Sequence, residues 1–189
     1  METKNSYSES LKKKYENVCG KRYTNCNGLS CINDMEFCSP LLYYLASQCD
    51  HVTEFGTRTV CSTWALMAGL PKVLRSYDFV PCNTKELEEI AAENNIDFKF
   101  VCASTIDPKV SIEKTDLLFI DTEHTATQLS VELALHGNKA SKYIAFHDTS
   151  SHPVLLSVID NFVKQNTQWR YKLVLSEDCG ITVIENGTV

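Results

Sequence analysis

The sequence contains few glycines, few prolines and no long apolar run. Of its 189 residues, 7 are glycine and 5 are proline, which excludes a collagen-like or low-complexity chain. No apolar run approaches the roughly 20 residues that span a bilayer. Residues 1–20 are polar and lack the apolar core of a secretory signal. These absences predict a cytoplasmic protein without a membrane partner.

Positive charge is also scarce. The chain carries 18 Lys and Arg against 24 Asp and Glu, a formal net charge of −6, and its pI is near 5.4. Binding along a nucleic-acid backbone depends on excess positive charge that neutralises phosphates. A small-molecule substrate is therefore expected, and a nucleic-acid partner is not.

Cysteine is abundant, but its pattern does not indicate disulfides or zinc. The nine cysteines are an odd number without a secretory signal, so reduced thiols are expected. Cys19, Cys26, Cys31 and Cys38 are separated by six, four and six residues, a wider pattern than the C-x2-C pairs of most structural zinc sites. We interpret them as packed small hydrophobic side chains, and any further role of this group stays open.

The composition is that of an ordinary globular chain, 43% hydrophobic and 22% charged, and its length suits one well-cored domain. We expect residues 1–45 to form a helical cover segment and residues 46–189 to form the domain itself. Residues 32–49 within and beside the cover suggest one amphipathic helix or two.

From residue 51 onward, short β-rich runs alternate with helical stretches, which predicts βαβ units and a mostly parallel sheet. Strands are expected at 51–55, 73–79, 98–104, 116–121, 142–148, 169–176 and 180–186. Helices are expected at 62–70, 83–95, 125–137 and 153–166. No helix separates the last two strands, so they should form an antiparallel hairpin. The expected fold class is α/β, with a doubly wound, seven-stranded sheet of the Rossmann type.

Polar and charged residues follow the expected parallel strands. They are Glu54 to Gly56, Asp78, Ser104, Asp121 to His124, and His147 with Asp148. In an open parallel sheet, ligands bind outside the carboxyl ends of the strands, where the strand order reverses. These residues therefore predict a binding site along one edge of the sheet.

The segments VTEFGTRTVCST, SYD, DLLFIDTEHTATQLSVEL and YIAFHDT resemble the class I S-adenosylmethionine-dependent methyltransferases. More narrowly, they are similar to the small-molecule O-methyltransferases related to catechol O-methyltransferase and to the antibiotic-sugar methyltransferase and cephalosporin-hydroxylase group. The resemblance covers roughly residues 50–187 and is strongest at LLFIDTEH and AFHDT. It implies a Rossmann-like methyltransferase that uses S-adenosylmethionine to methylate a hydroxyl of a small substrate, such as a sugar or glycan.

The resemblance also implies which residues bind the cofactor. In it, Gly56 lets the backbone pass close to the methionine part, Ser62 lies near the carboxylate, and Asp78 accepts the two ribose hydroxyls. The full implied set is Glu54, Gly56, Thr57, Arg58, Ser62, Asp78, Ser104 and Asp121.

Asp121, His147 and Asp148 fall where metal-dependent members of these families hold an ion, which for carboxylate ligands suggests Mg²⁺. Here the fifth strand ends in His-Asp, a departure from the Asp-Asn pair. Two mechanisms stay open: activation of the substrate hydroxyl by a divalent metal, or removal of its proton by His147 or His124.

The loop after the first strand leaves other functions open. A nicotinamide-binding loop needs G-x-G-x-x-G, and GTRTVC supplies only the first glycine. The family glycine four residues after Gly56 is Val60, and a β-branched residue is expected to keep a negative φ. If this loop sits away from the cofactor, the chain would be a methyltransferase-fold protein without methyl transfer, serving as a binding or assembly subunit.

Several aromatic residues have plainer explanations. His136 and His152 are expected on the surface, and Trp64 and Trp169 are expected to pack in the core rather than against a substrate. The methyl acceptor, the use of a metal and the formation of a homodimer are left open by the sequence.

Overall fold

The computed structural model describes residues 7–24 and 28–188. Its main feature is a seven-stranded sheet in the order β5-β4-β3-β6-β7-β9-β8. The strands are β3 (His51–Phe55), β4 (Val73–Asp78), β5 (Asp97–Cys102), β6 (Thr115–Ile120), β7 (Ala140–His147), β8 (Trp169–Leu175) and β9 (Ile181–Asn186). The first five run parallel, and β9 is antiparallel to both β7 and β8. The predicted doubly wound sheet with a final antiparallel pair is confirmed.

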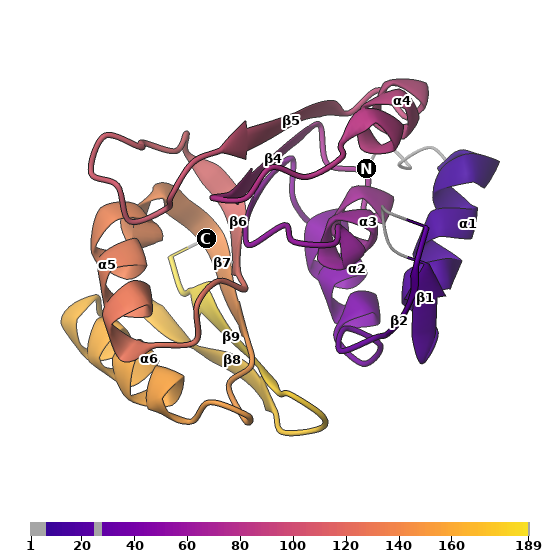
Figure 1. Ribbon diagram of the computed structural model, residues 1–189. Helices are drawn as coiled ribbons and strands as arrows, with labels where there is room; N and C mark the ends of the chain where they lie inside the picture. Colours follow the sequence, from indigo (N-terminus) through magenta and orange to yellow (C-terminus); the bar gives the residue numbers. More distant parts are fainter. Residues whose placement is uncertain (1–6, 25–27, 189) are drawn as a thin grey trace.

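Helices cover both faces of the sheet (Figure 1). On one face lie α1 (Glu9–Val18), α2 (Ser39–Ser47), α3 (Cys61–Ala68) and α4 (Lys85–Glu93). On the other lie α5 (Ala126–His136), which runs into the short 3₁₀ helix η1 (Gly137–Lys139), and α6 (Val154–Gln165). Among the described residues, none of the helices has the length and apolarity that crossing a membrane requires.

Strand β6 shows why this sheet is buried on both sides. Leu117 and Phe119 belong to the core beneath α1 to α4, whereas Leu118 and Ile120 belong to the core beneath α5 and α6. Successive side chains of a strand point to opposite faces. A strand covered on both faces is therefore apolar throughout, as the sequence DLLFID predicts.

The N-terminal region adds a small hairpin, β1 (Arg22–Thr24) with β2 (Ser30–Ile32), to helices α1 and α2. Of the 32–49 stretch, only Ser39–Ser47 is helical, with Pro40 in the first turn. A proline fits there because the first backbone N–H groups of a helix have no partner within the helix. Side chains of α1 and α2 pack with those of α3 in one apolar core.

The strand order reverses between β3 and β6, and this places the loops that follow them side by side. Phe55 at the end of β3 is in register with Ile120 at the end of β6. The N–H of Asp121 donates to the carbonyl of Phe55 at 2.9 Å. Gly56 and Asp121 therefore leave the sheet at the same point, which is where ligands bind in this architecture.

Candidate active site at the carboxyl edge of the sheet

Gly56 begins the loop between β3 and α3, and no other residue fits its position. Its φ is +89°, and a Cβ on it would lie 1.8 Å from the carbonyl oxygen of Asp121. Its N–H donates to the carbonyl of Tyr77 at 2.9 Å, which ties the loop to the end of β4. The backbone at Gly56 thus closely approaches the strand-end residues that follow β6.

The rest of this loop contradicts the prediction for Val60. Its φ is +63° and that of Arg58 is +40°, so the loop contains two non-glycine residues in the left-handed region. Such residues cost on the order of 1–3 kcal/mol each and persist where surrounding contacts enforce them. Val60 is only 2% exposed and packs in the core, and its N–H donates to the carbonyl of Thr57 at 2.7 Å. Burial of the Val60 side chain therefore offsets the strain that the sequence argument treated as prohibitive.

Asp78 holds this loop through the backbone. One carboxylate oxygen accepts the N–H of Arg58 at 2.8 Å, and the other accepts the N–H of Val80 at 2.9 Å. Asp78 remains partly exposed at the end of β4. The guanidinium of Arg58 turns the other way and pairs with Asp34 of the N-terminal region at 2.8 Å.

Glu54 does not face the edge of the sheet. It is fully buried and accepts hydrogen bonds from the hydroxyls of Ser62 at 2.6 Å, Thr63 at 2.8 Å and Ser76 at 2.6 Å. Burial raises the pKa of Glu54 to about 7, although these hydroxyl donors lower it. The structure thus directs Ser62 toward Glu54, whereas the resemblance implies a place beside the cofactor carboxylate.

Thr57 and Ser104, two further residues of the implied cofactor set, are placed differently. Thr57 is buried and donates its hydroxyl to the carbonyl of Tyr77 at 3.4 Å. Ser104 is exposed in the loop after β5, where its carbonyl accepts the N–H of Asp107 at 3.1 Å. Thr57 therefore supports the loop, while Ser104 leaves its side chain open at the edge.

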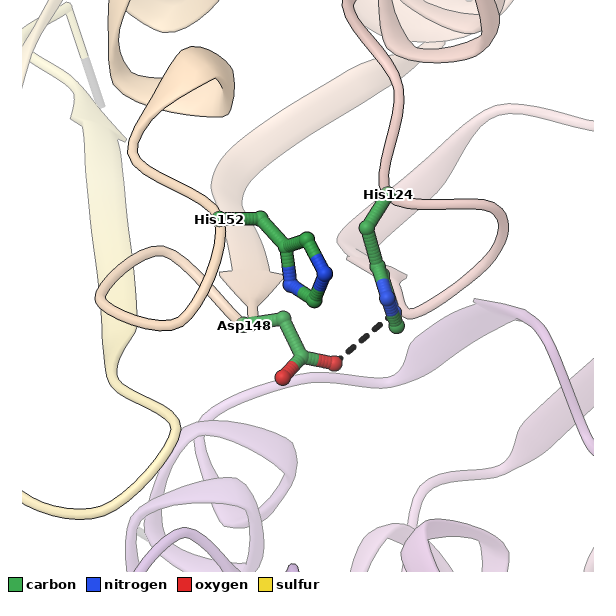
Figure 2. A group of neighbouring side chains, drawn as sticks. All are labelled: His124, Asp148 and His152. Carbon is green, nitrogen blue, oxygen red and sulfur yellow. Dashed lines mark ion pairs between the residues drawn. The ribbon is translucent and has the colours of Figure 1, made fainter.

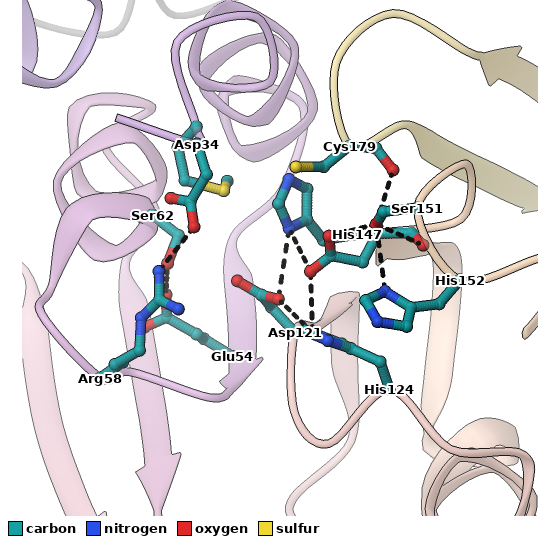
Figure 3. A network of polar contacts seen from close by, with 12 residues as sticks. Asp34, Glu54, Arg58, Ser62, Asp121, His124, His147, Ser151, His152 and Cys179 are labelled. Carbon is teal, nitrogen blue, oxygen red and sulfur yellow. Dashed lines mark hydrogen bonds and ion pairs between the residues drawn. The ribbon is translucent and has the colours of Figure 1, made fainter. Parts of the chain in front are cut away.

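Two carboxylates and two imidazoles meet where β6 and β7 end (Figure 3). The Nδ1 of His147 lies 3.3 Å from Asp121 and 3.2 Å from Asp148. The Nε2 of His124 lies 2.7 Å from Asp148 and 3.6 Å from Asp121. We call these four residues the acid–imidazole cluster. It combines all of the predicted catalytic residues in one place.

The charges of this cluster stabilise one another. Burial alone would raise the pKa values of Asp121 and Asp148, but their imidazole partners outweigh it and lower both. The pKa of His147 is raised, because its contacts with Asp121 and Asp148 outweigh the effect of burial. The pKa of His124 is raised by Asp121 and also by Asp148. This direction favours the imidazolium form of His147, whose Nδ1 lies between the two carboxylates.

The C-terminal hairpin holds the loop that carries Asp148. The carbonyl of Cys179 accepts the N–H groups of Ser150 at 2.9 Å and Ser151 at 3.1 Å. A Cβ on Gly180 would lie 2.2 Å from the Ser150 hydroxyl, so the two turns pack tightly. Asp148 has a φ of +60° and accepts the hydroxyl of Ser151 at 2.7 Å. The side chain of Asp148 is thus fixed by contacts on several sides.

His152 is a member of this site that the sequence argument missed. Its ring centroid lies 4.4 Å from that of His124, and its Nδ1 lies 3.1 Å from the Ser151 hydroxyl. The N–H of His152 donates to the carbonyl of Asp148 at 2.8 Å. The four-residue spacing in HDTSSH was the available signal, since a turn or a helix start brings positions four apart together.

The prediction that His136 lies on the surface is wrong. It is 1% exposed, its Nε2 contacts the carbonyl of Thr105 at 2.8 Å, and its ring meets the edge of Phe55. It lies on the face of α5 that packs against the sheet. Trp64 and Trp169 are 4% and 2% exposed, as expected of packing residues.

Two groups among the described side chains are arranged so that they could hold a metal ion. They are Asp121 with His147 and Asp148, and His124 with Asp148 and His152. Neither contains a cysteine. Of the four early cysteines, Cys38 is buried and Cys19 half-buried, whereas Cys26 and the side chain of Cys31 lie outside the described residues.

A separate hollow lies away from this cluster. It has a volume of about 560 Å³ and is lined by the later turns of α5 and α6, including Asn138, Asn161 and Gln165. These turns lead away from the strand ends that carry the acid–imidazole cluster. No titratable side chain of the described residues lines this hollow, whereas the edge of the sheet carries the acid–imidazole cluster.

The strand order, the antiparallel last strand and the glycine-initiated loop at the switch point are those of the fold of the class I S-adenosylmethionine-dependent methyltransferases. A search of protein-family models found no match for the chain, and a search of curated proteins found none either.

Solved structures match the fold along most of the chain. An O-methyltransferase from Bacillus cereus in complex with SAH, S-adenosylhomocysteine, is 13% identical with a TM-score of 0.62, over 95% of this chain and 91% of the other. An SAH-bound methyltransferase from Podospora anserina is 13% identical with a TM-score of 0.57, over 97% and 90%. A ribosomal protein L11 methylase from Lactobacillus delbrueckii is 18% identical with a TM-score of 0.53, over 78% of each chain. The chain therefore has the methyltransferase fold, which is shared by proteins with different acceptors.

Proposed function

We propose that this protein is an S-adenosylmethionine-dependent O-methyltransferase that acts on a small hydroxylated molecule, such as a sugar or glycan. The observation that carries the proposal is the contact between the Gly56 loop and the acid–imidazole cluster. A Cβ on Gly56 would collide with the backbone of Asp121, so the cofactor loop and the proton-binding groups share one edge. The SAH-bound structures of similar fold support the choice of cofactor.

The cofactor residues of this chain fit their proposed partners. Asp78 is a partly exposed carboxylate at the end of β4, and it retains lone pairs for two ribose hydroxyls after accepting two backbone N–H groups. Ser104 and Arg58 offer exposed donors along the same edge. When bound, S-adenosylmethionine supplies a methyl group activated by its sulfonium. The chain's residues hold and orient the two reactants, which supplies much of the rate of such a displacement.

Removal of the acceptor's proton falls to the exposed end of the cluster. The His124 side chain is 31% exposed, whereas that of His147 is 1% exposed. A substrate hydroxyl can therefore approach His124 and its partner Asp148, but not the ring of His147. We assign proton removal to the His124–Asp148 pair and the positioning of both carboxylates to His147.

Magnesium fits this cluster poorly. Mg²⁺ prefers six oxygen ligands in a near-octahedral arrangement, and the cluster offers the carboxylates of Asp121 and Asp148 among imidazole nitrogens. Imidazole suits transition metals better. The proposed mechanism therefore contains no step through Mg²⁺.

The test combines binding with turnover. Isothermal titration calorimetry should detect binding of S-adenosylmethionine and S-adenosylhomocysteine, and transfer of an isotopically labelled methyl group should be measured on a panel of catechols, sugars and nucleosides. Absence of cofactor binding at millimolar concentration would refute the proposal. Binding with transfer only to nitrogen acceptors would refute O-methylation alone.

A second function is favoured by Asp78 and Arg58. Both oxygens of Asp78 already accept backbone N–H groups, and Arg58 pairs with Asp34 across the loop. These contacts also suit a methyltransferase-fold subunit that binds or assembles with other molecules without methyl transfer. Such a protein would bind neither cofactor nor product in the same titration. The proposed compartment is the cytoplasm, and size measurement in solution decides whether the chain forms a homodimer.

A further inference from the structure

His124, Asp148 and His152 form a compact group on the exposed side of the acid–imidazole cluster (Figure 2). One nitrogen of each imidazole and one oxygen of Asp148 lie within 4.8 Å of one another. The closest pair, His124 Nε2 and Asp148 Oδ2, is 2.7 Å apart. The planes of the two imidazole rings are tilted by 37° relative to each other. Two nitrogen ligands and one carboxylate thus come to one point from two loops: His124 from the loop after β6, and Asp148 and His152 from the loop between β7 and α6.

The surroundings fix the orientation of these side chains. Ser151 donates its hydroxyl to Asp148 Oδ1 at 2.7 Å, so it can accept a hydrogen bond from Nδ1–H of His152 at 3.1 Å. We assign the tautomer of His152 in which Nδ1 carries the proton. Its Nε2 then keeps its lone pair. His147 contacts Asp148 Oδ2 from the buried side at 3.2 Å. Hydrogen bonds of this kind orient the ligands of metal sites and raise their basicity.

We propose that His124, Asp148 and His152 bind a divalent transition-metal ion of the Zn²⁺ type. Ligands about 2.0–2.2 Å from such an ion are about 3.0–3.5 Å from one another, so closing the group around an ion needs side-chain rotations only. Two imidazoles with one carboxylate are a donor set that favours transition metals over Mg²⁺. A carboxylate oxygen of Asp121 lies 3.6 Å from His124 Nε2. This oxygen can serve as a further ligand of the ion.

The proposal changes the role of His147. Its Nδ1 already lies between two carboxylates, and its side chain is 1% exposed. It therefore supports Asp148 from behind, while His152 takes the place in the ligand set that the sequence suggests for His147. Metal binding stands on these side chains alone. Only the ion's role rests on the proposed function: with the ion bound, His124 and Asp148 are its ligands, so coordination would lower the pKa of the acceptor hydroxyl in place of proton removal by the metal-free His124–Asp148 pair.

The experiment uses the full chain after removal of metal with a chelator. Calorimetric titration should show Zn²⁺ binding at least about a hundredfold more tightly than Mg²⁺. Co²⁺ should give the visible absorption of a site with nitrogen and oxygen ligands. A near-ultraviolet band from thiolate ligation would overturn the proposal, because it would place the ion on the cysteines. Zn²⁺ affinity no greater than that for Mg²⁺ would overturn it as well.

His152→Ala should weaken Zn²⁺ binding at least about tenfold and leave the melting temperature without metal unchanged. His51→Ala is the matched control, since His51 lies near Glu113 at the opposite end of the sheet. His152→Asp is a second variant, which replaces a nitrogen ligand by an oxygen ligand. The ratio of Zn²⁺ affinity to Mg²⁺ affinity should therefore be smaller than in the unmodified protein. Equal Zn²⁺ affinity in His152→Ala and the unmodified protein would overturn the proposal.

Cofactor binding is measured on the same samples. Zn²⁺ binding without S-adenosylmethionine binding would refute the proposed function and leave the metal site standing. The reverse result would refute the metal site alone.

Discussion

The carboxylate in β3 and the carboxylates that follow β6 and β7 have opposite surroundings. Glu54 in β3 is fully buried and accepts only hydroxyls of its own half of the sheet. Asp121 and Asp148, which follow β6 and β7, face imidazoles that themselves titrate. The first carboxylate is satisfied by groups that do not ionise, whereas the others share protons with their partners. The difference supports the proposal that Glu54 stabilises the fold and that the acid–imidazole cluster carries the proposed chemistry.

The largest expected effect is on the rate of turnover, and it distinguishes the acid–imidazole cluster from Glu54. Asp148→Asn should lower the rate of methyl transfer about a thousandfold, because the amide does not stabilise the imidazolium that forms when His124 takes the acceptor's proton, while cofactor affinity stays unchanged. Steady-state kinetics and calorimetry measure the two quantities. Asp116→Asn is the control, an aspartate at the other end of β6 that accepts the N–H of Asp50 at 2.8 Å. Equal loss in both variants would contradict the assignment.

Glu54→Ala should act on stability. Removal of the carboxyl leaves the hydroxyls of Ser62, Thr63 and Ser76 without their buried acceptor, at a cost of about 3 kcal/mol in the free energy of unfolding. Urea denaturation measures it. Glu54→Gln keeps an oxygen acceptor and should cost less. A loss of turnover without any loss of stability would move Glu54 into the chemistry.

The pH dependence of stability should also depend on Glu54. Its pKa is about 7 in the folded protein against 4.5 as the ordinary value, so between these values the folded state holds a proton that the unfolded state has lost. The stabilisation is complete below pH 4.5 and is lost as the pH rises to 7. We expect a decrease of about 2 kcal/mol from pH 5 to 7.5. This component should be absent in Glu54→Gln, and an identical pH profile would contradict it.

Asp78 tests the cofactor side of the comparison. Asp78→Ala should raise the dissociation constant of S-adenosylmethionine about tenfold or more, because hydrogen bonds to a charged acceptor contribute about 1.5–3 kcal/mol. Asp160→Ala is the control, since Asp160 is exposed on α6 and accepts the hydroxyl of Tyr171 at 2.5 Å. If Asp160→Ala weakened binding as much, a general loss of structure rather than a lost ribose contact would explain the result.

The smallest expected effect concerns the exposed ion pair between Arg58, in the loop after β3, and Asp34. Asp34→Ala removes an ion pair whose Arg58 side chain is 65% exposed, so the free energy of unfolding should fall by less than about 1 kcal/mol. Asp50→Ala, which removes the exposed pair with Lys72, is the matched control. A loss of several kcal/mol in Asp34→Ala alone would show that this pair maintains the strained loop.

Much of the fold could be predicted from the residues alone. DLLFID predicted a strand buried on both faces, and the 153–166 stretch predicted α6, because both signals act within a few residues. The strand-end positions of Asp121 and Asp148 followed from the alternation of strands and helices. The φ of Val60 and the burial of His136 could not be predicted, because each depends on contacts with distant segments.

By itself, the sequence determined the alternation of elements and the charged residues at the strand ends, since periodicity and turn chemistry are local properties. The tertiary structure decided which of these residues meet. It enclosed Glu54 among hydroxyls, placed His147 between two carboxylates and brought His152 to His124. The physical reason is that burial and partner geometry arise only when separate strands align, and these two quantities decide whether a carboxylate stabilises the fold or takes part in chemistry.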